Sequence, residues 1–304
     1  MLSERWFVKT MWKILLTFGI LALFIMVIAV FIVFLATGFS EPSLGAGYIA
    51  VIPIKGEITS GGCGGSLLSG EIACANSDEV KKMIKDANDD WTVDAILLDI
   101  DSGGGAVVAT REITTAVKSS KKPVVAYIGE TGASGAYYIA SAARRIVADD
   151  NSLTGSIGVR MEIPHYYDLM GKIGVNVTTI KAGGEKDVGS PYRPMTEEER
   201  RDLQDIVDVI YDDFIEMVAV NRNMSAEYVK SIAEGKVYVG SKAKEIGLVD
   251  ELGGFDYALE VAASEAGIEG EPKVKNMAPE RSLRDFLSAG ASNGVLYSIV
   301  KYLG

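Results

Sequence analysis

Two residues of this sequence could together hydrolyse a peptide bond without help from a histidine. Ser134 lies in a turn of small residues, Thr-Gly-Ala-Ser134-Gly-Ala-Tyr-Tyr, between an apolar run and a helix-like run. Lys186 follows in a Gly-rich segment, Gly-Glu-Lys186-Asp-Val-Gly-Ser-Pro. A serine hydroxyl becomes a good nucleophile when a base takes its proton, and a neutral lysine can be that base. The chain contains one histidine, so the identity of the base is the first question.

Each of these residues also has an ordinary structural explanation. A serine that opens a helix is usually an N-cap. A solvated lysine, with a pKa of about 10.4, is protonated at neutral pH, and a catalytic one must be desolvated until its pKa is about 7–8. Asp187, next to Lys186, would oppose this change unless it points elsewhere. His165, directly after Pro164, is the other candidate base, in a position typical of a surface or cap residue.

A glycine turn could stabilise the negative charge that develops when Ser134 attacks. Asp-Ser-Gly-Gly-Gly105 directly follows a predicted strand and precedes a predicted helix. Backbone N–H groups at such a turn can hold an oxyanion, although a plain tight turn would have the same sequence. Ala136 stands where the Gly-x-Ser-x-Gly elbow of the α/β-hydrolases needs glycine, which disfavours that family.

In order and spacing, these motifs resemble the signal peptide peptidase A family across most of residues 48–265. The other motifs that carry the resemblance are Leu-Thr-Gly-Ser-Ile-Gly158 and Met-Thr-Glu-Glu-Glu-Arg200. The resemblance implies an α/β, Clp-protease/crotonase-like fold with repeated ββα units, and a Ser/Lys dyad that needs no cofactor or metal. Ser134 then matches the nucleophile, Lys186 the general base and Ser156 the serine that orients the lysine.

The same resemblance assigns an oxyanion hole to the N–H groups of Gly104, Gly105 and Gly135. Gly103 occupies the position where the family usually has proline, which makes the turn more flexible. The family cleaves signal peptides left in the membrane, and it accepts small and apolar side chains. Its short members form dome-shaped homo-octamers in which neighbouring protomers supply the serine and the lysine, so the resemblance implies a homo-oligomer here.

The N-terminal sequence predicts a membrane anchor. Residues 14–36 contain no charged residue, and a bilayer-spanning helix needs roughly 20 apolar residues. A cleaved signal peptide is the alternative, but its apolar region is only about 7–15 residues long. Arg5, Lys9 and Lys13 favour a cytoplasmic N-terminus. The predicted organisation is a cytoplasmic segment 1–13, a transmembrane helix 14–36, a linker 37–47 and an extracytoplasmic protease domain 48–304.

Charge and cysteine content narrow the possible partners. The net charge of −11 disfavours nucleic-acid binding through the bulk surface. Cys63 and Cys74, the two cysteines of the chain, bracket a Gly/Ser-rich stretch, and both a disulfide and two free thiols fit this spacing. Two cysteines and one distant histidine do not form a zinc-binding pattern.

Strands and helices are predicted to alternate, which indicates a largely parallel sheet in one α/β domain. The predicted strands are 48–54, 95–100, 123–128, 145–148 and 175–180, and residues 56–74 are predicted to be a loop. The predicted helices run from Asn76 to about 87, then 106–119, 134–143, a long helix capped by Thr196 and Glu199 to about 220, and 224–235, 241–246 and 257–266. One face of the long helix collects Ile206, Val209, Ile210, Phe214 and Met217.

Three other functions share parts of this pattern. A crotonase-like acyl-CoA enzyme would have the same fold but would normally be cytoplasmic. A Clp-type protease would use His165 with an aspartate in place of Lys186. A non-catalytic membrane scaffold would explain the anchor but not both dyad positions.

Overall fold

The computed structural model describes residues 23–28, 47–61 and 74–277 of the chain. The chain divides into two units, Met1–Leu44 and Gly45–Gly304. Residues 23–28 of the first unit are helical, and the remainder of the predicted membrane segment 14–36 lies outside the described residues. Within the described ranges, no helix combines the length and the hydropathy needed to cross a bilayer.

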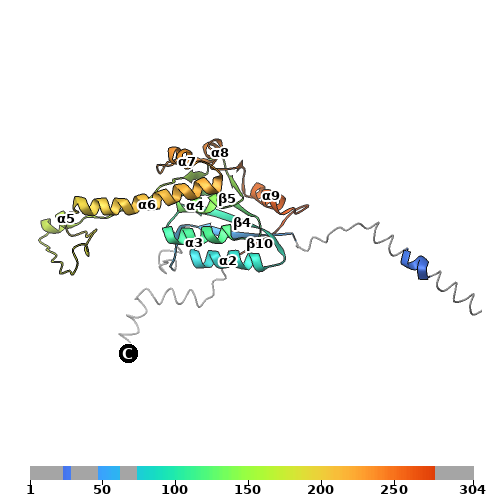
Figure 1. Cartoon of the computed structure of the whole chain (residues 1–304), viewed down its shortest axis with the longest axis horizontal. Coiled ribbons are helices and arrows are strands. Elements are labelled where there is room, and N and C mark those ends of the chain that lie inside the picture. The colour runs from blue at the N-terminus through green and yellow to red at the C-terminus, as the bar shows by residue number, and fades with distance from the viewer. Residues whose placement is uncertain (1–22, 29–46, 62–73, 278–304) are drawn as a thin grey trace, which may run out of the picture. The chain divides into compact units, whose positions relative to one another are not determined.

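The second unit is built on a mixed α/β fold with an eight-stranded sheet (Figure 1). Its strands are, in spatial order, β10 (Lys273–Asn276), β1 (Tyr48–Lys55), β4 (Val93–Ser102), β5 (Val124–Ala133), β6 (Arg145–Ala148) and β9 (Glu251–Leu252), with β7 (Leu153–Gly155) paired to β5 and β8 (Val237–Val239) paired to β7. All pairs in this sheet are parallel except β7 with β8. The prediction of a largely parallel sheet is confirmed, as are the four strands predicted between residues 48 and 148.

Helices cover both faces of the sheet, because its central strands are apolar on both sides. The helices are α2 (Ser77–Asp89), α3 (Val107–Lys118), α4 (Gly135–Ser141), α5 (Tyr167–Lys172), α6 (Glu197–Arg222), α7 (Ala226–Ile232), α8 (Gly240–Glu245) and α9 (Phe255–Ala266). Along β4, Ile96 and Leu98 belong to one buried cluster with α2, α3 and α4, while Leu97 belongs to a second cluster with α9. Successive residues of β4 thus alternate between the two clusters, as expected for a strand that is buried on both faces of the sheet.

Side-chain caps explain where the two predicted capped helices begin. The Asn76 side chain accepts hydrogen bonds from the N–H groups of Asp78 (2.9 Å) and Glu79 (3.2 Å) at the start of α2. At the start of α6, the Glu199 N–H donates to Thr196 Oγ1 (3.1 Å) and the Thr196 N–H donates to Glu199 Oε2 (2.8 Å). The predicted capping box of α6 is confirmed.

Two predictions of local structure are wrong. The predicted loop 56–74 instead contains strand β2 (Glu57–Thr59), and its last residue is the first residue of strand β3 (Cys74–Asn76). These two strands pair in parallel. Cys74 is disulfide-bonded, and Cys63, the other cysteine of the sequence, lies outside the described residues. The predicted strand 175–180 is irregular, with Ile180 97% exposed. Its β-branched residues favour an extended backbone, but a strand also needs a neighbour, and no described strand pairs with it.

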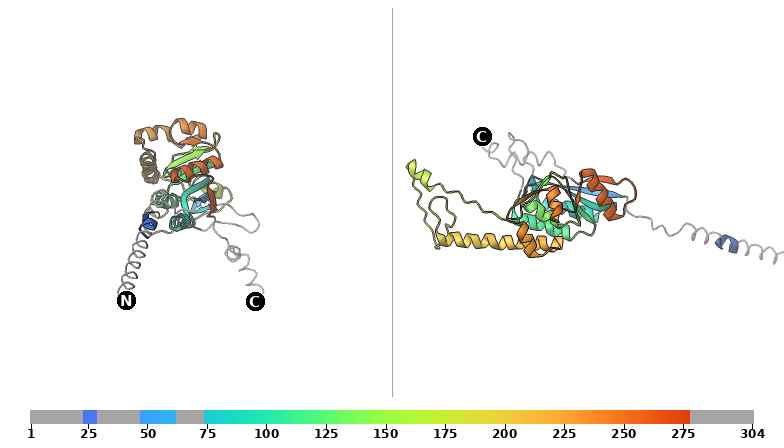
Figure 2. Two further views of the ribbon diagram at one scale, coloured as in Figure 1. Left: turned by 90° about the vertical axis from the view of Figure 1, so that its right-hand side faces the viewer. Right: turned by 90° about the horizontal axis from the view of Figure 1, so that it is seen from above.

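One part of this unit projects from the rest. We call residues 160–210, with α5 and the first half of α6, the arm, and the remainder of the described part of this unit the body (Figures 1 and 2). Between Ile157 and Phe214 no apolar side chain is buried. The apolar face predicted for α6 is therefore buried only in its C-terminal half, because Ile206 and Val209 are 50% and 71% exposed.

Candidate active site

Ser134 occupies a strained turn between β5 and α4. Its backbone has φ 53° and ψ −124°, a conformation that non-glycine residues rarely adopt. The turn is held by hydrogen bonds from the Ser134 N–H to the Gly155 carbonyl (2.9 Å) and from the Tyr138 N–H to the Ser134 carbonyl (2.9 Å). The Ser134 side chain makes no capping hydrogen bond. The ordinary N-cap explanation therefore fails for this serine, and strain of this kind is typical of functional sites.

Ser134 lines a cavity of about 1020 Å³ in which residues from several elements meet. Its wall is formed by the glycine turn after β4, the first turns of α3, Ser156 after β7 and the middle of α6, between residues 204 and 214. A cavity of this size is large enough for several residues of an extended peptide. The cations that line it are Arg111 and Arg160, and arginine cannot act as a base because it stays protonated.

The glycine turn lies directly against Ser134. Gly104 has φ 101°, and a Cβ atom on it would lie 2.7 Å from the Gly135 nitrogen and 3.0 Å from Ser134 Cβ. The sequence analysis assigned the Gly104 N–H to the oxyanion hole. In the structure this N–H donates to Ser102 Oγ at 3.1 Å, so it is already engaged within the turn. The N–H groups of Gly105 and Gly135 make no hydrogen bond within the described residues. They are the two donors that this geometry leaves for an oxyanion.

Strand β2, which the sequence analysis missed, holds the glycine turn in place. The Ile58 N–H donates to the Gly104 carbonyl at 3.0 Å, and the Ala106 N–H donates to the Ile58 carbonyl at 2.8 Å. A Cβ atom on Gly105 would lie 2.1 Å from the Ile58 carbonyl oxygen, so this position requires glycine. The one signal for β2 in the sequence is a single apolar residue between two polar ones, which is too short to predict a strand.

Ser156 reaches the same cavity from the neighbouring strand. Ala133 of β5 pairs with Gly155 of β7, so Ser134 and Ser156 follow the adjacent ends of two paired strands. Ser156 also has a positive φ, 50°, and its N–H donates to the Lys236 carbonyl at 2.7 Å. The structure therefore brings together Ser134, Ser156 and the two free N–H groups.

The structure does not bring Lys186 to Ser134 within one chain. Lys186 lies on the arm, in consecutive turns between Gly184 and Gly189, and its exposed side chain makes no ion pair or hydrogen bond with any described residue. His165 is also exposed on the arm, with its ring 5.8 Å from that of Tyr167. Among the described residues that line the cavity there is no lysine or histidine.

Tyr138 is one of two tyrosines among the described residues that line the cavity, with Tyr211. Tyr138 donates a hydrogen bond to Asp213 Oδ2 at 3.1 Å. Burial, followed by the charge of Asp213, raises the pKa of Tyr138 above its usual range. Tyr138 therefore stays protonated near neutral pH and cannot serve as the base for the serine.

A comparison with known families decides the class of protein. The model of peptidase family S49 matches residues 116–269, a range that contains Ser134, Ser156 and Lys186. The chain belongs to this family. The S49 assignment makes the protein a serine protease and confirms the resemblance to signal peptide peptidase A.

Relatives of this S49 protease come from archaea and bacteria. The Methanocaldococcus jannaschii protein MJ0651, which is named as a protease, is 42% identical over 232 residues, covering 73% of this chain and 74% of its own. An Enterococcus faecium protein named as signal peptide peptidase SppA is 37% identical over 188 residues, covering 61% of this chain and 55% of its own. Protease 4 of Haemophilus influenzae is 31% identical over 265 residues, covering 84% of this chain but 42% of its own.

A solved structure shares the fold of the S49 chain. It is the 1510-N membrane-bound stomatin-specific protease, in a lysine-to-alanine form with a substrate peptide, and it superposes with a TM-score of 0.50 at 18% identity. The match covers 81% of this chain and 97% of that one. At this identity the similarity concerns the fold alone.

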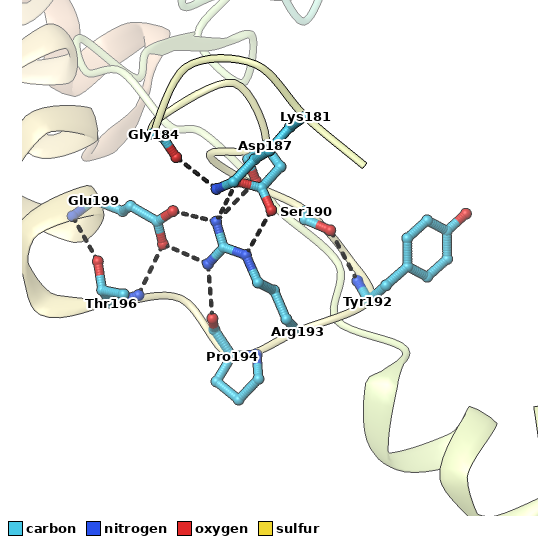
Figure 3. A network of polar contacts seen from close by, with 9 residues as sticks. All are labelled: Lys181, Gly184, Asp187, Ser190, Tyr192, Arg193, Pro194, Thr196 and Glu199. Carbon is cyan, nitrogen blue, oxygen red and sulfur yellow. Dashed lines mark hydrogen bonds and ion pairs between the residues drawn. The ribbon is translucent and has the colours of Figure 1, made fainter. Parts of the chain in front are cut away.

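Next to Lys186 the S49 chain carries a polar cluster that engages the neighbouring carboxylate (Figure 3). Arg193 Nε donates to Asp187 Oδ2 and Arg193 Nη2 to Asp187 Oδ1, both at 2.9 Å, and Lys181 also pairs with Asp187. On its other side, Arg193 Nη1 donates to Glu199 Oε2 at 2.9 Å. The hydrogen bonds from Arg193 and then Lys181 hold the pKa of Asp187 below its usual range, and Arg193 lowers the pKa of Glu199 to about 2.

This cluster answers the objection that Asp187 would keep Lys186 protonated. The Asp187 carboxylate has two cationic partners, neither of which is Lys186. In the described residues no group of His, Cys, Asp and Glu side chains is arranged to hold a metal ion. The chemistry that these residues support directly is acyl transfer through a serine.

Proposed function

We propose that this protein is a membrane-bound endopeptidase of the Clp-protease/crotonase fold class whose active sites form between copies of the chain. In this proposal Ser134 is the nucleophile and Lys186 of a neighbouring copy is the general base. One observation supports it most strongly: Ser134 stands uncapped beside two free N–H groups, in a cavity to which the described part of its own chain brings no lysine or histidine. Lys186 meanwhile lies on the projecting arm, and its side chain has no partner among the described residues.

The exposed apolar residues of the arm favour a second copy as its partner. Those more than 40% exposed include Met161, Leu169, Ile173, Val175, Ile180, Ile206 and Val209. Large exposed apolar surfaces of this kind mark interaction sites. A homo-oligomer would cover this surface and bring the arm of one copy to the cavity of the next. In a closed ring such as an octamer, the arm of every copy would reach the cavity of a neighbour.

The reaction follows from these positions. Neutral Lys186 takes the proton of the Ser134 hydroxyl as its oxygen attacks the peptide carbonyl, and the N–H groups of Gly105 and Gly135 stabilise the oxyanion. When the C–N bond breaks, the Lys186 ammonium returns the proton to the departing amine. Water then hydrolyses the acyl-serine with the same base. Ser156, beside Ser134, would accept a hydrogen bond from the lysine and orient it.

Apolar peptides, including signal peptides left after secretion, are the substrates we propose. The predicted anchor 14–36 would tether the domain at the outer face of the cytoplasmic membrane, where such peptides are released. No cofactor or metal enters the mechanism. The similarity to signal peptide peptidase A and the word membrane-bound in the name of the solved relative support this location and substrate class.

A fluorophosphonate probe tests the nucleophile. Labelling of the full-length protein in detergent should be lost in Ser134→Ala, and peptide hydrolysis should fall by on the order of 10⁴-fold or more in Ser134→Ala and Lys186→Ala. Lys186→Arg should be equally inactive, because arginine cannot give up its proton. Ser156→Ala should lose less, since it orients the base and transfers no proton itself. If His165→Ala is inactive while Lys186→Ala is active, the Clp-type Ser/His mechanism replaces the dyad.

Co-expression tests whether the site lies between copies. Ser134→Ala and Lys186→Ala chains, with different affinity tags, are purified together so that only mixed oligomers are measured. Interfaces that pair an intact Ser134 with an intact Lys186 should restore part of the activity. Mixed oligomers as inactive as each single mutant would place both residues in one chain.

A further inference from the structure

We infer that Arg193 is a positioning residue for Lys186: it ties the lysine-bearing turn to the start of α6 and keeps the Asp187 carboxylate away from the lysine (Figure 3). The inference rests on the proposed function, in which Lys186 is the base. It adds a residue that neither the family assignment nor the sequence motifs identify as functional.

The geometry supports the first half of this inference. The guanidinium of Arg193 bridges two carboxylates that belong to different parts of the arm, Asp187 in the turn and Glu199 in the first turn of α6. It also donates to the backbone carbonyls of Asp187 (3.1 Å) and Pro194 (3.1 Å). Asp187 and Glu199 side chains are only 12% and 10% exposed, in a region without a buried apolar residue. The turn is therefore held mainly by polar contacts, with Arg193 at their centre.

The charge distribution supports the second half. A carboxylate beside a lysine favours the protonated lysine, which cannot act as a base. Asp187 adjoins Lys186 in the chain, but Arg193 and Lys181 occupy both of its oxygens. Arg193 and Lys181 hold the pKa of Asp187 well below its usual range, and Arg193 lowers the pKa of Glu199 to about 2, so the cluster itself stays ionised far below neutral pH. A limb of the pH–rate profile near neutrality must then belong to another group.

Other charged groups could also act on Lys186, and they must be kept constant in a test. On the arm these are Lys181, Glu185 and Glu199 together with Glu162 and His165, whose segment contacts the turn through Ile163 and Tyr166. In the cavity that Lys186 would enter they are Glu57, Arg111, Arg160, Asp208, Asp213 and Glu234. Of these groups only Glu199 forms an ion pair with Arg193, so a change at position 193 acts directly on Glu199 and leaves the contacts of the others in place. Because histidine titrates near neutrality, each profile is repeated in His165→Ala.

The experiment compares Arg193→Gln with wild type in the full-length protein, using a fluorogenic peptide of alanine and leucine residues. We expect kcat at neutral pH to fall by at least about tenfold with little change in KM, and the acid limb of the pH–rate profile to move up by about one pH unit or more. Asp187→Asn in the Arg193→Gln background should move the limb back. Arg193→Lys, which keeps the charge but loses the planar fork, should be intermediate. Arg200→Gln is the matched control, because Arg200 is exposed in the first turn of α6, seven residues after Arg193, and pairs only loosely with Glu197 at 3.9 Å.

The outcomes separate this inference from the proposed function. Activity in Lys186→Ala would overturn the proposed function and the inference with it. An inactive Lys186→Ala with a normal kcat and pH profile in Arg193→Gln would overturn the inference alone. In a third outcome, kcat falls in Arg193→Gln, the acid limb stays where it is in wild type, and Asp187→Asn does not restore kcat. Arg193 would then be merely structural, which also overturns the inference. If Arg193→Gln fails to assemble, as judged by light scattering, the same comparison is made with Arg193→Lys.

Discussion

The two ends of α6 are held by arginine clusters in different surroundings. At the C-terminal end, Arg222 donates to both oxygens of Asp250 at 2.7 and 2.9 Å, with its side chain only 8% exposed, and Phe214 and Val218 pack into the core. At the N-terminal end, Arg193 makes a similar pair of bonds, but no apolar side chain around it is buried. Among the described residues of one chain, the body has a packed apolar core, whereas the arm has no apolar partner.

This difference fits a division of labour in the proposed site. The strained backbone of Ser134 and the close contact of Gly104 with it require a surrounding structure that does not yield. The tightly packed sheet and helices of the body supply that rigidity. A base supplied by another copy has a different requirement. It must lie on a segment that projects from its own chain, with an ordered tip and with an exposed apolar surface that can pack against the partner. A protease divided in this way would be active only after assembly.

The largest expected difference between the two regions is in apolar packing. Phe214→Ala should lower the free energy of unfolding by roughly 3–5 kcal/mol, because it opens a cavity in the core beneath α6. Val209→Ala, five residues earlier on the same helix and 71% exposed, should change it by less than about 0.5 kcal/mol. Both values come from denaturant unfolding in dilute protein. Similar losses in the two variants would show that the arm is packed within its own chain.

The ion pairs should differ in the same direction by a smaller amount. Arg222→Gln leaves the Asp250 carboxylate without its charged partner in a mostly buried position and should cost roughly 3 kcal/mol. Arg193→Gln should lower the melting temperature less, because the Arg193 side chain is 31% exposed, against 8% for Arg222, and no buried apolar side chain surrounds it. The measurement is thermal unfolding of both variants. A large loss in Arg193→Gln would mean that the arm cluster stabilises the fold as well as the turn.

The sequence was sufficient to predict the central strands and most helices of the body, because their signals are local. Apolar runs with turn residues between them predict strands buried on both faces, and the Asn76 and Thr196 caps predict where helices begin. Ser134 and the glycine turn could be singled out because each follows a predicted strand, whereas Ser156 was identified only through the family resemblance. The parallel register of the sheet brings these positions together. Strand β2 was missed because three residues carry no periodicity.

The arm shows where sequence patterns are insufficient. Residues 175–180 and the first half of α6 have the patterns of a buried strand and a half-buried helix, yet both are exposed in the chain. The periodicity of apolar residues indicates which face of an element is buried, but it does not identify the element or the chain that covers this face. If the partner is a second copy, as we propose, these patterns were correct for the assembly and could not be satisfied by one chain. The role we assign to Arg193 depends on contacts across six residues of irregular backbone, which no periodic signal reveals.

A third prediction concerns the capping box at the N-terminal end of α6, in the arm. Thr196→Ala removes the acceptor for the Glu199 N–H at the first turn of α6 and should cost about 1 kcal/mol. Because no core residue lies near this end of the helix, the loss should appear as local fraying, measured by faster amide exchange over the first turns of α6. Asn76→Ala removes the equivalent cap of α2 in the body and should instead lower the global melting temperature. Global unfolding in both variants would show that the arm and the body unfold together.

The smallest expected effect concerns two buried threonines on α3. Thr114 Oγ1 donates to the Thr110 carbonyl at 2.8 Å, whereas the Thr110 hydroxyl, on the cavity wall, has no partner among the described residues. Thr110→Val should therefore raise the free energy of unfolding by less than about 1 kcal/mol, while Thr114→Val should lower it by a similar amount. Denaturant unfolding of both variants measures this difference.

Activity then decides what the unpartnered hydroxyl is for. Thr110 Oγ1 lies 2.6 Å from the place where a Cβ atom on Gly135 would be, so it borders the proposed oxyanion donors and requires glycine after Ser134. If the donors act alone, Thr110→Val should keep kcat/KM within about twofold of wild type, as Thr114→Val should. A loss of more than about tenfold in Thr110→Val alone would mean that the hydroxyl contacts the bound peptide or its oxyanion. In that case the body contributes one more group to the site, and the arm still supplies the base.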